Sequence, residues 1–237
     1  MGMEVLRTAP SGVKEIDDAL KGGFIRPSNL MVVGAPLCGK REFGMQLLSA
    51  GLSRDEGAIY VSTSQTAEEV RAAWLSFGLE AESEEKGLVR FVDCYSKMLG
   101  AQSTDTRFVS RIPSLLDYTK LAVTVNDLCT SYLVNNVAVR LLFDSLSSLL
   151  IYSSLQTVMR FLHIFMGQLR KRKVLGFFLL EEGAHDNETF SFLKTFSNGV
   201  LRMDSDLRIV QFEGFPEGGR VALSYELTEK GVVLRAA

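Results

Sequence analysis

The sequence has few of the features that mark secreted or metal-stapled proteins. It contains three cysteines in 237 residues, Cys38, Cys94 and Cys129. Their odd number and wide spacing argue against a disulfide framework and against a zinc ribbon. Free thiols are typical of a reducing compartment, so we expect a cytoplasmic location. Residues 1–12 contain no apolar stretch and do not resemble a signal peptide.

Long apolar runs and an excess of one charge are also absent from the sequence. The longest apolar run near a predicted helix is interrupted by Asp144, by serines and by Arg160, so no membrane span is expected. The 26 basic and 28 acidic residues give a formal net charge of −2. This balance does not favour binding to nucleic acid, although it leaves room for a local basic patch.

The sequence does contain a regular alternation of short apolar runs and helical periods. The apolar runs predict strands over 30–33, 58–61, 88–92, 137–143 and 174–180. The helical periods predict helices over 40–52, 67–77, 114–133, 146–172 (as one or two helices) and 187–197. Residues 94–112 show no clear period and predict an irregular surface segment. This alternation predicts an α/β fold with a mostly parallel central sheet that is flanked by helices on both faces.

The C-terminal third has a different pattern of short strands. They are predicted over 199–203, 207–213, 220–227 and 231–235, with a turn at Gly214, Pro216, Gly218 and Gly219. These strands predict an antiparallel extension of the parallel sheet. Because no repeat, low-complexity tract or linker interrupts the chain, we expect residues 1–237 to form a single domain.

One segment nearly matches the phosphate-loop pattern G-x-x-x-x-G-K-[ST]. It consists of Gly34, Ala35, Pro36, Leu37, Cys38, Gly39, Lys40 and Arg41. In that pattern the glycines let backbone N–H groups surround phosphates, the lysine reaches the outer phosphates and the hydroxyl binds Mg²⁺. The segment follows a predicted buried strand and precedes a predicted helix, as the pattern requires. The alternative interpretation is a strand-to-helix turn that carries a surface lysine.

A carboxylate at the end of the predicted strand 137–143 belongs to the same hypothesis. Ligands of open α/β sheets bind at the carboxyl ends of the strands, where Asp144 lies. In nucleotide enzymes an aspartate in this position holds Mg²⁺, usually through water. The alternative role for Asp144 is to cap the helix that follows it.

Several further segments, taken in order, resemble archaeal KaiC-like proteins of the RecA superfamily. They are the opening segment 11–27, the strand at 60–63, the acidic strand at 143–150 and the C-terminal strands at 207–214 and 225–232. The resemblance covers nearly the whole chain with plausible spacing. It implies a RecA-like P-loop fold, ATP or ADP as the ligand, and assembly with copies of itself or with a related ATPase.

The chain departs from the family pattern at the residues that carry chemistry. Leu37 replaces a loop glycine, and Arg41 replaces the hydroxyl that binds Mg²⁺. The family's glutamate pair after the second strand reads Ser64-Gln65, and neutral groups cannot take a proton from water at pH 7. The family's K-x-R pair, which reaches a neighbouring subunit's γ-phosphate, aligns with Gln211 and Glu213.

Glu68 and Glu69 lie one helical turn beyond the glutamate position and are an alternative source of a general base. With the metal ligand, the base and the trans cations all substituted, we expect little hydrolysis, because each contributes to stabilising the phosphoryl transition state. Arg41 suggests a further hypothesis, in which its guanidinium pairs with phosphate oxygens and makes Mg²⁺ unnecessary. The alternative is an Arg41 side chain that points to solvent or to a nearby glutamate.

These features predict a nucleotide-binding regulatory module with little or no hydrolysis that acts through self-assembly or a partner. Two alternatives stay open: an active ATPase with a non-standard site, and an interaction domain that binds no nucleotide. Binding to DNA has little support, because the net charge is slightly acidic and no basic aromatic stretch occurs. His185, in the loop 181–186 after a predicted strand, is either a ligand or partner contact or part of a polar surface loop.

Overall fold

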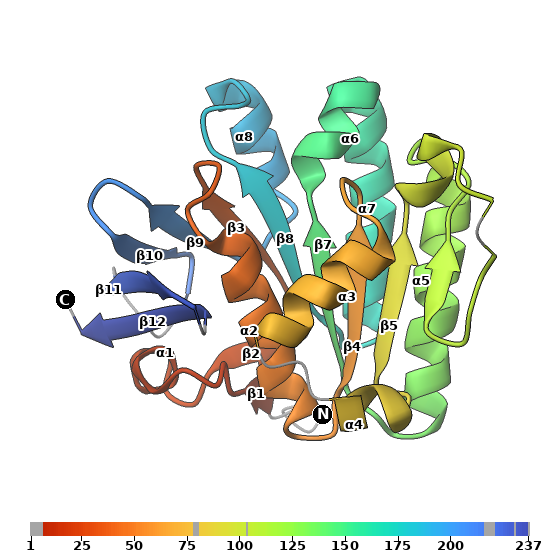
Figure 1. Ribbon diagram of the computed structural model, residues 1–237. Helices are drawn as coiled ribbons and strands as arrows, with labels where there is room; N and C mark the ends of the chain where they lie inside the picture. The colour runs from red at the N-terminus through yellow and green to blue at the C-terminus, as the bar shows by residue number, and fades with distance from the viewer. Residues whose placement is uncertain (1–6, 78–80, 103, 216–220, 230, 237) are drawn as a thin grey trace, which may run out of the picture.

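The centre of the molecule is one large twisted sheet (Figure 1). The computed structural model describes residues 7–77, 81–102, 104–215, 221–229 and 231–236. Within these residues the sheet has ten strands. Across the sheet they are β12 (Gly231–Ala236), β11 (Val221–Thr228), β10 (Ile209–Glu213), β9 (Gly199–Asp204), β3 (Ser28–Gly34), β8 (Leu175–Glu181), β7 (Val139–Asp144), β4 (Gly57–Ser62), β5 (Val89–Asp93) and β6 (Val109–Arg111).

The sheet combines a parallel part with an antiparallel edge. All neighbours from β9 to β6 pair in parallel, and β3 lies between β8 and β9. The strands β10, β11 and β12 continue the sheet in antiparallel pairing, as the sequence predicts. Consequently the carboxyl ends of the parallel strands all meet at one edge, the upper edge in Figure 1. Ligands of α/β sheets bind at such an edge.

Helices cover both faces of this sheet. They are α1 (Lys14–Ala19), α2 (Lys40–Leu52), α3 (Ala67–Ser76), α4 (Ala81–Glu85), α5 (Tyr118–Val134), α6 (Leu146–Tyr152), α7 (Leu155–Lys171) and α8 (Asn187–Lys194). Helices α2 and α3 pack on one face, and α5 and α7 pack on the other (Figure 1). The parallel strands are buried on both faces, and their continuous apolar sequence is the expected result of this arrangement.

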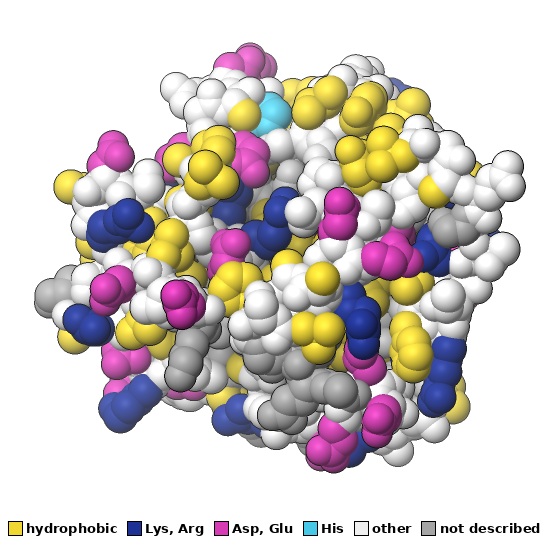
Figure 2. Space-filling model, in the orientation of Figure 1, with side chains coloured by type: hydrophobic (Ala, Val, Ile, Leu, Met, Phe, Trp, Pro, Cys, Tyr) yellow, Lys and Arg dark blue, Asp and Glu magenta, His cyan; other side chains and the backbone are white. Residues whose placement is uncertain are grey.

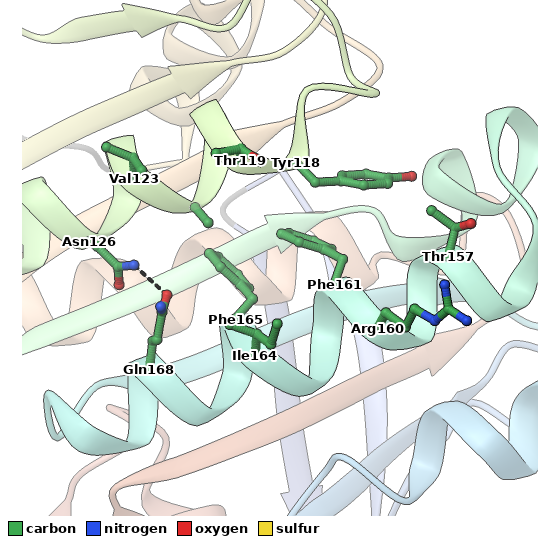
Figure 3. Close-up of a pocket in the computed structure, with 11 residues that line it drawn as sticks. Tyr118, Thr119, Val123, Asn126, Thr157, Arg160, Phe161, Ile164, Phe165 and Gln168 are labelled. Carbon is green, nitrogen blue, oxygen red and sulfur yellow. Dashed lines mark hydrogen bonds between the residues drawn. The ribbon is translucent and has the colours of Figure 1, made fainter.

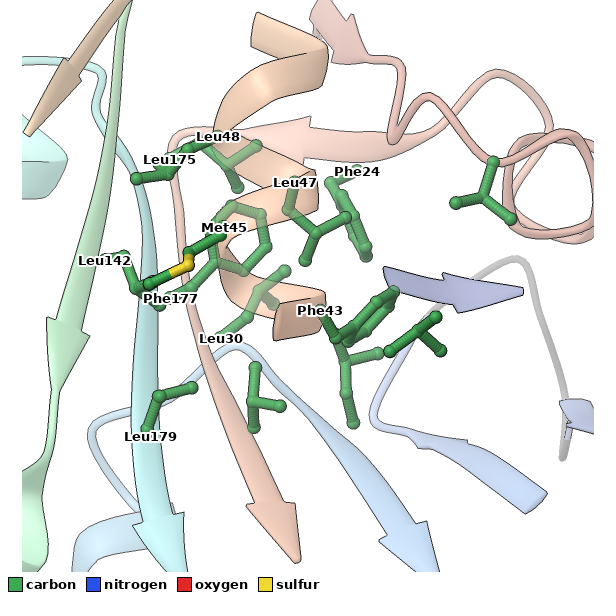
Figure 4. Close-up of a cluster of buried hydrophobic side chains, with 14 of the residues drawn as sticks. Phe24, Leu30, Phe43, Met45, Leu47, Leu48, Leu142, Leu175, Phe177 and Leu179 are labelled. Atoms are coloured by element: carbon green, nitrogen blue, oxygen red, sulfur yellow. The ribbon is translucent and has the colours of Figure 1, made fainter. Parts of the chain in front are cut away.

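The face under α2 contains a large cluster of buried apolar side chains (Figure 4). Phe43, Leu47 and Leu48 point from α2 toward the sheet, where they meet residues such as Leu30 and Phe177. Each of these five side chains is at most 1% exposed. Burying one such side chain contributes about 1.5–3 kcal/mol. The first turn of α2 is therefore anchored firmly against β3, and the loop that joins them is held at both ends.

The elements predicted from the sequence are confirmed, with differences in the irregular regions. The range 146–172 contains two helices, because Ser153 is extended and the Ser154 side chain caps α7 by accepting a hydrogen bond from the Thr157 N–H. Residues 94–112 are not wholly irregular, since they contain a short 3₁₀ turn, Ser96–Leu99, and strand β6. The predicted turn residues Pro216, Gly218 and Gly219 lie outside the described residues.

The segment before β3 contains elements that the sequence pattern does not predict. It contains α1 and a separate two-stranded sheet of β1 (Arg7–Ala9) and β2 (Phe24–Arg26). Among the helices in the described ranges, none combines the length and the apolar character that a membrane crossing requires.

Candidate functional site

The predicted phosphate loop connects the carboxyl end of β3 to the first residue of α2. Helix α2 begins at Lys40, directly after Gly39, which has a φ of 92°. Gly34 closes β3, and its carbonyl accepts a hydrogen bond from the Glu182 N–H at 2.9 Å. Residues 34–41 thus lie at the edge where the parallel strands end, and the unpaired N–H groups at the start of α2 face the loop.

Two positions in this loop require glycine. At Gly39 a side chain would need the left-handed region, and an added Cβ would lie 2.1 Å from Cδ2 of Leu227. At Gly34 an added Cβ would lie 2.5 Å from Sγ of Cys38. Leu37 stands where the family pattern has a further loop glycine, and it adopts a φ of 63° although it has a side chain. This confirms that the position requires a positive φ, which costs a leucine about 1 kcal/mol.

Lys40 is buried beneath the loop and is engaged by two acceptors. Its Nζ donates to the carbonyl oxygen of Ala35 at 2.9 Å and to Oε2 of Glu181 at 2.6 Å. The Lys40 side chain is 6% exposed, whereas that of Glu181 is 30% exposed. The ammonium group is therefore held inside the curve of the loop by a carboxylate that solvent can still reach.

Arg41 occupies the position where the family pattern has a metal-binding hydroxyl. Its Nε donates to Oδ2 of Asp144 at 2.6 Å, and the Tyr60 hydroxyl donates to the same oxygen at 2.6 Å. Burial and the nearby Asp144 carboxylate raise the pKa of Tyr60 well above its ordinary value, so the phenol stays a neutral donor. Asp144 is thus fixed by two side chains, and Arg41 points neither to a glutamate nor simply into solvent.

These groups surround a cavity of about 200 Å³. It is lined by Pro36, Leu37, Gly39, Lys40, Arg41, Glu42, Asp144, Leu179 and Glu181. Basic and acidic side chains also meet in the upper centre of the face shown in Figure 2, over the start of α2. With two cations and three carboxylates, the cavity walls carry nearly balanced charge.

Most of the site residues predicted from the sequence lie at this cavity. Gly34, Ala35 and Cys38 are exceptions, because they form the loop without lining the cavity. The Cys38 side chain is 1% exposed and packs into the apolar cluster under α2. Burial raises the pKa of its thiol, so Cys38 is a packed core residue of the loop.

Several residues of the site are not predicted from the sequence: Glu42, Leu179 and Glu181 line the cavity, and Tyr60 and Leu227 contact its residues. Tyr60 lies on the predicted strand 58–61, and Glu181 directly follows the predicted strand 174–180, but their contacts with the loop depend on the order of strands in the sheet. Leu227 packs on Gly39 from β11. The available sequence signal was weak: Glu181 is the first charged residue after an apolar strand, at the edge where ligands of such sheets bind.

The residues that replace the family's catalytic glutamates stand apart from the loop cavity. Ser64 is exposed, and neither Ser64 nor Gln65 lines the cavity. Glu68 pairs with Arg111, and Glu69 forms a capping box with Thr66 at the start of α3. The two glutamates considered as an alternative base are therefore engaged elsewhere, and neither lines the cavity.

The positions that correspond to the family's trans cations lie on β10. Gln211 and Glu213 are on this strand, and Glu213 pairs with Lys194 of α8 and with Arg202 of β9. The hydrogen bond from Lys194 is the main cause of a lowered pKa at Glu213, so the side chain is an anion at neutral pH. An anionic group at this position would repel phosphate.

His185 lies beside the cavity residue Glu181. Its Nε2 is 2.9 Å from Oγ of Ser147, and the same oxygen accepts a hydrogen bond from the Glu181 N–H at 3.0 Å. Burial lowers the pKa of His185, so the imidazole is mostly neutral at pH 7. His185 therefore connects the loop after β8 to the start of α6.

A second concavity of about 440 Å³ lies between α5 and α7 on the opposite face (Figure 3). Its walls are mainly apolar, with Tyr118 and Phe161 stacked at 4.7 Å and Phe161 and Phe165 stacked at 5.0 Å. Asn126 and Gln168 are hydrogen-bonded at one end. Of the described residues that line it, Arg160 alone is charged, so this groove lacks the converging ionisable groups of the loop cavity.

The residues at the loop do not fit a bound Mg²⁺ ion. Mg²⁺ takes six oxygen ligands in nearly octahedral geometry. Here the hydroxyl ligand is replaced by a guanidinium, and Oδ2 of Asp144 already accepts two hydrogen bonds. Among the residues that the structure describes, no group of three or more metal-binding side chains occurs. A water-mediated contact of Asp144 with Mg²⁺ stays a prediction. The Arg41 guanidinium and the two hydrogen bonds to Oδ2 of Asp144 argue against it.

The fold and the position of the loop define a RecA-like α/β protein of the KaiC-like type. A KaiC-like protein from Pyrococcus horikoshii OT3 superposes with a TM-score of 0.73, over 97% of this chain and 99% of that protein. The sequence identity is 16%, so the likeness establishes the fold alone.

The chain belongs to a family of unknown function, DUF7504, whose match covers residues 27–202. It is also similar to a UPF0273 protein from Aeropyrum pernix, with 30% identity over 143 residues, 55% of this chain and 58% of that protein. A UPF0273 protein from Methanopyrus kandleri is 30% identical over 105 residues, 44% of this chain and 42% of that protein. The chain therefore spans about half the length of these curated relatives.

A more distant similarity is to the circadian clock oscillator protein KaiC. The KaiC of Thermosynechococcus vestitus is 28% identical over 93 residues, which are 39% of this chain and 18% of that protein. These matches confirm the resemblance inferred from the order of the motifs.

Proposed function

We propose that this protein is a nucleotide-binding regulatory module that hydrolyses ATP slowly or not at all. The observation that carries this proposal is the loop between β3 and α2. It retains the left-handed Gly39 and places the Lys40 ammonium inside its curve, at the N-terminus of a helix of 13 residues. Backbone N–H groups and a buried cation at a helix N-terminus are the features that bind phosphate.

The residues that stand where the family pattern has its catalytic groups support the second half of the proposal. Neither Ser64 nor Gln65 lines the cavity, and Glu213 replaces a cation that would stabilise the transferring phosphoryl group. Removing such a cation typically costs three to five orders of magnitude in rate. The Glu181 carboxylate lies beside the loop, but it already accepts a hydrogen bond from the Lys40 ammonium.

Regulation through assembly is the third part of the proposal. Three apolar side chains at the carboxyl edge of the sheet are exposed: Leu37 by 97%, Ile151 by 74% and Tyr152 by 52%. Exposed apolar groups beside a ligand site favour contact with another protein surface. Light scattering with and without ATP tests this part, and we expect the mass to change when nucleotide binds.

Thermal unfolding in the presence of ATP and ADP tests the binding itself. A ligand that binds only the folded state adds about 2.7 kcal/mol of stability at a hundred times its Kd. We expect a rise in Tm for the wild-type protein and none for Lys40→Ala. The matched control is Lys86→Ala, which removes an exposed lysine that pairs with Glu82 on α4. If millimolar nucleotide leaves the wild-type Tm unchanged, the proposal fails.

One observation favours the alternative of an interaction domain that binds no nucleotide. Both cations of the loop already have carboxylate partners, Lys40 with Glu181 and Arg41 with Asp144. A phosphate must compete with Glu181 for Lys40, and this competition lowers the affinity. In this alternative the two ion pairs only stabilise the carboxyl edge of the sheet. Thermal unfolding with added ATP and ADP distinguishes this alternative from nucleotide binding.

A further inference from the structure

The geometry points to nucleotide binding without a metal ion, in which the Arg41 guanidinium takes the place of Mg²⁺ beside the phosphates. This inference rests on the proposed nucleotide binding and specifies the form of the ligand. The ligand is a nucleoside di- or triphosphate that carries no bound Mg²⁺.

The first support is the position of the guanidinium. Arg41 is the second residue of α2 and follows Lys40, so both cations project from the first turn of the helix that faces the loop. Both line the same cavity of about 200 Å³. The Arg41 side chain is 34% exposed, so part of the guanidinium is open to a ligand.

The second support is the way in which Asp144 holds this group. The contact with Asp144 uses the Nε–H of Arg41. A guanidinium has five N–H donors in a rigid plane, so its terminal nitrogens keep donors of their own. Planar donors of this kind match the oxygens of a phosphate group and form two parallel hydrogen bonds with it.

The third support is Tyr60, which fixes the carboxylate from the other side. The Tyr60 side chain is 0% exposed and donates to the same oxygen of Asp144 as Arg41 does. An aspartate that is anchored by a buried phenol cannot turn away, and so it orients the guanidinium before the ligand arrives. Preorganised donors lower the cost of binding, because less conformational freedom is lost.

Charge balance explains why a metal is unnecessary at this site. In a typical phosphate site Mg²⁺ reduces the charge of the phosphates and bridges them to an acidic strand end. Here Arg41 pairs with Asp144 through its Nε–H and keeps its terminal N–H donors for the phosphates. An added Mg²⁺ ion would be repelled by the guanidinium.

Isothermal titration calorimetry with ATP, in excess Mg²⁺ and in excess EDTA, tests this inference. We expect the wild-type protein to bind ATP in EDTA with a Kd within about twofold of its value in Mg²⁺. Arg41→Thr restores a hydroxyl and frees Asp144. We expect this variant to bind about tenfold more weakly than the wild type in EDTA, and to regain affinity when Mg²⁺ is added.

Arg54→Thr is the matched control, because Arg54 lies just beyond the other end of α2 and donates to the Ala50 carbonyl. It should bind ATP as the wild type does in both solutions. If Arg41→Thr does not fold, Arg41→Lys keeps the charge without the planar donors and should also weaken binding in EDTA.

The outcomes separate this inference from the proposed function. Wild-type binding that requires Mg²⁺ would overturn the role of Arg41 and leave nucleotide binding intact. Absence of wild-type binding in both solutions would overturn nucleotide binding, and with it this inference.

Discussion

The two ends of strand β7 carry ion pairs of similar chemistry in different surroundings. At the amino end, Arg140 is 0% exposed and pairs with Glu56, which also binds Arg26. At the carboxyl end, Asp144 pairs with Arg41 beside the loop cavity. The difference shows that an ion pair indicates a site only when its groups remain open to a ligand.

The hydrogen bonds of the two arginines sharpen this contrast. Arg140 donates to the carbonyl oxygens of Leu47 and Pro10 as well as to Glu56. Gly51 leaves room for it, since an added Cβ would lie 2.6 Å from the Arg140 Nε. All three nitrogens of Arg140 therefore have acceptors and serve stability, whereas Arg41 is half-buried and has donors available for a ligand.

Removal of the carboxylate at the amino end should have the largest effect on stability. Glu56→Ala leaves Arg140 buried without its anion, and breaking a buried pair in this way costs about 3–5 kcal/mol. Urea denaturation measures this loss as a lower transition midpoint. Asp55→Asn is the control, because Asp55 is exposed next to Glu56 and asparagine tolerates its φ of 56°. A loss of stability below about 1 kcal/mol would show that the Arg140–Glu56 pair contributes no more than an exposed ion pair does.

Removal of the Glu181 charge at the carboxyl edge of the sheet should increase the affinity for ATP. Glu181→Gln weakens the competitor for Lys40, so we expect the Kd for ATP to fall about tenfold, in line with a hydrogen bond to a charged group. Fluorescence titration with a labelled ATP analogue measures the change. The neighbouring Glu182→Gln, which loses a partner of Arg202, serves as the control. Weaker binding in Glu181→Gln would mean that Glu181 holds the site in its binding form.

The stability that Glu56 contributes at the amino end should depend on pH. Burial opposes ionisation of Glu56, but Arg140 and Arg26 together lower its pKa below the ordinary value of 4.5. A carboxyl with a lowered pKa in the folded state stabilises the fold fully above its ordinary pKa and loses this effect as the pH falls through the folded value.

We therefore expect the stability difference between the wild type and Glu56→Gln to be constant above about pH 5 and to shrink below the ordinary value of 4.5. Urea midpoints measured at pH values across this window test the expectation. A difference that grows on acidification would contradict the lowered pKa.

The smallest expected effect is at the tip of the loop. Leu37 has a φ of 63° and is 97% exposed, so its side chain makes few contacts that offset the backbone strain. Leu37→Gly should raise stability by about 0.5 kcal/mol, which is the relief of strain less the entropy of glycine in the unfolded chain. Thermal unfolding measures the change, and a clear loss of stability would show that Leu37 packs in the folded protein.

Much of the local structure could be predicted from the sequence, because it depends on local patterns. Helix α2 begins and ends as predicted from the apolar period that follows Gly39. Strand β6 was missed because it has three residues and lacks an apolar run. The phosphate loop was found because its pattern lies in eight consecutive residues.

The partners of the loop could not be predicted in the same way. Glu181 is 141 positions from Lys40 in the sequence, and the two meet only because β8 lies next to β3. Local patterns do not specify the order of strands. The apolar pattern predicts that Tyr60 lies in a buried strand, which is correct for its ring, but it gives no sign that the hydroxyl donates to Asp144.

Hydrogen–deuterium exchange with and without ATP tests the central claim most directly, because it reports on both ends of the sheet in one experiment. The account predicts slower amide exchange in peptides that cover residues 34–41 when ATP is added. It also predicts unchanged exchange in peptides that cover residues 54–58 at the amino end. Unchanged exchange in the loop at saturating ATP, or equal protection at both ends, would contradict it.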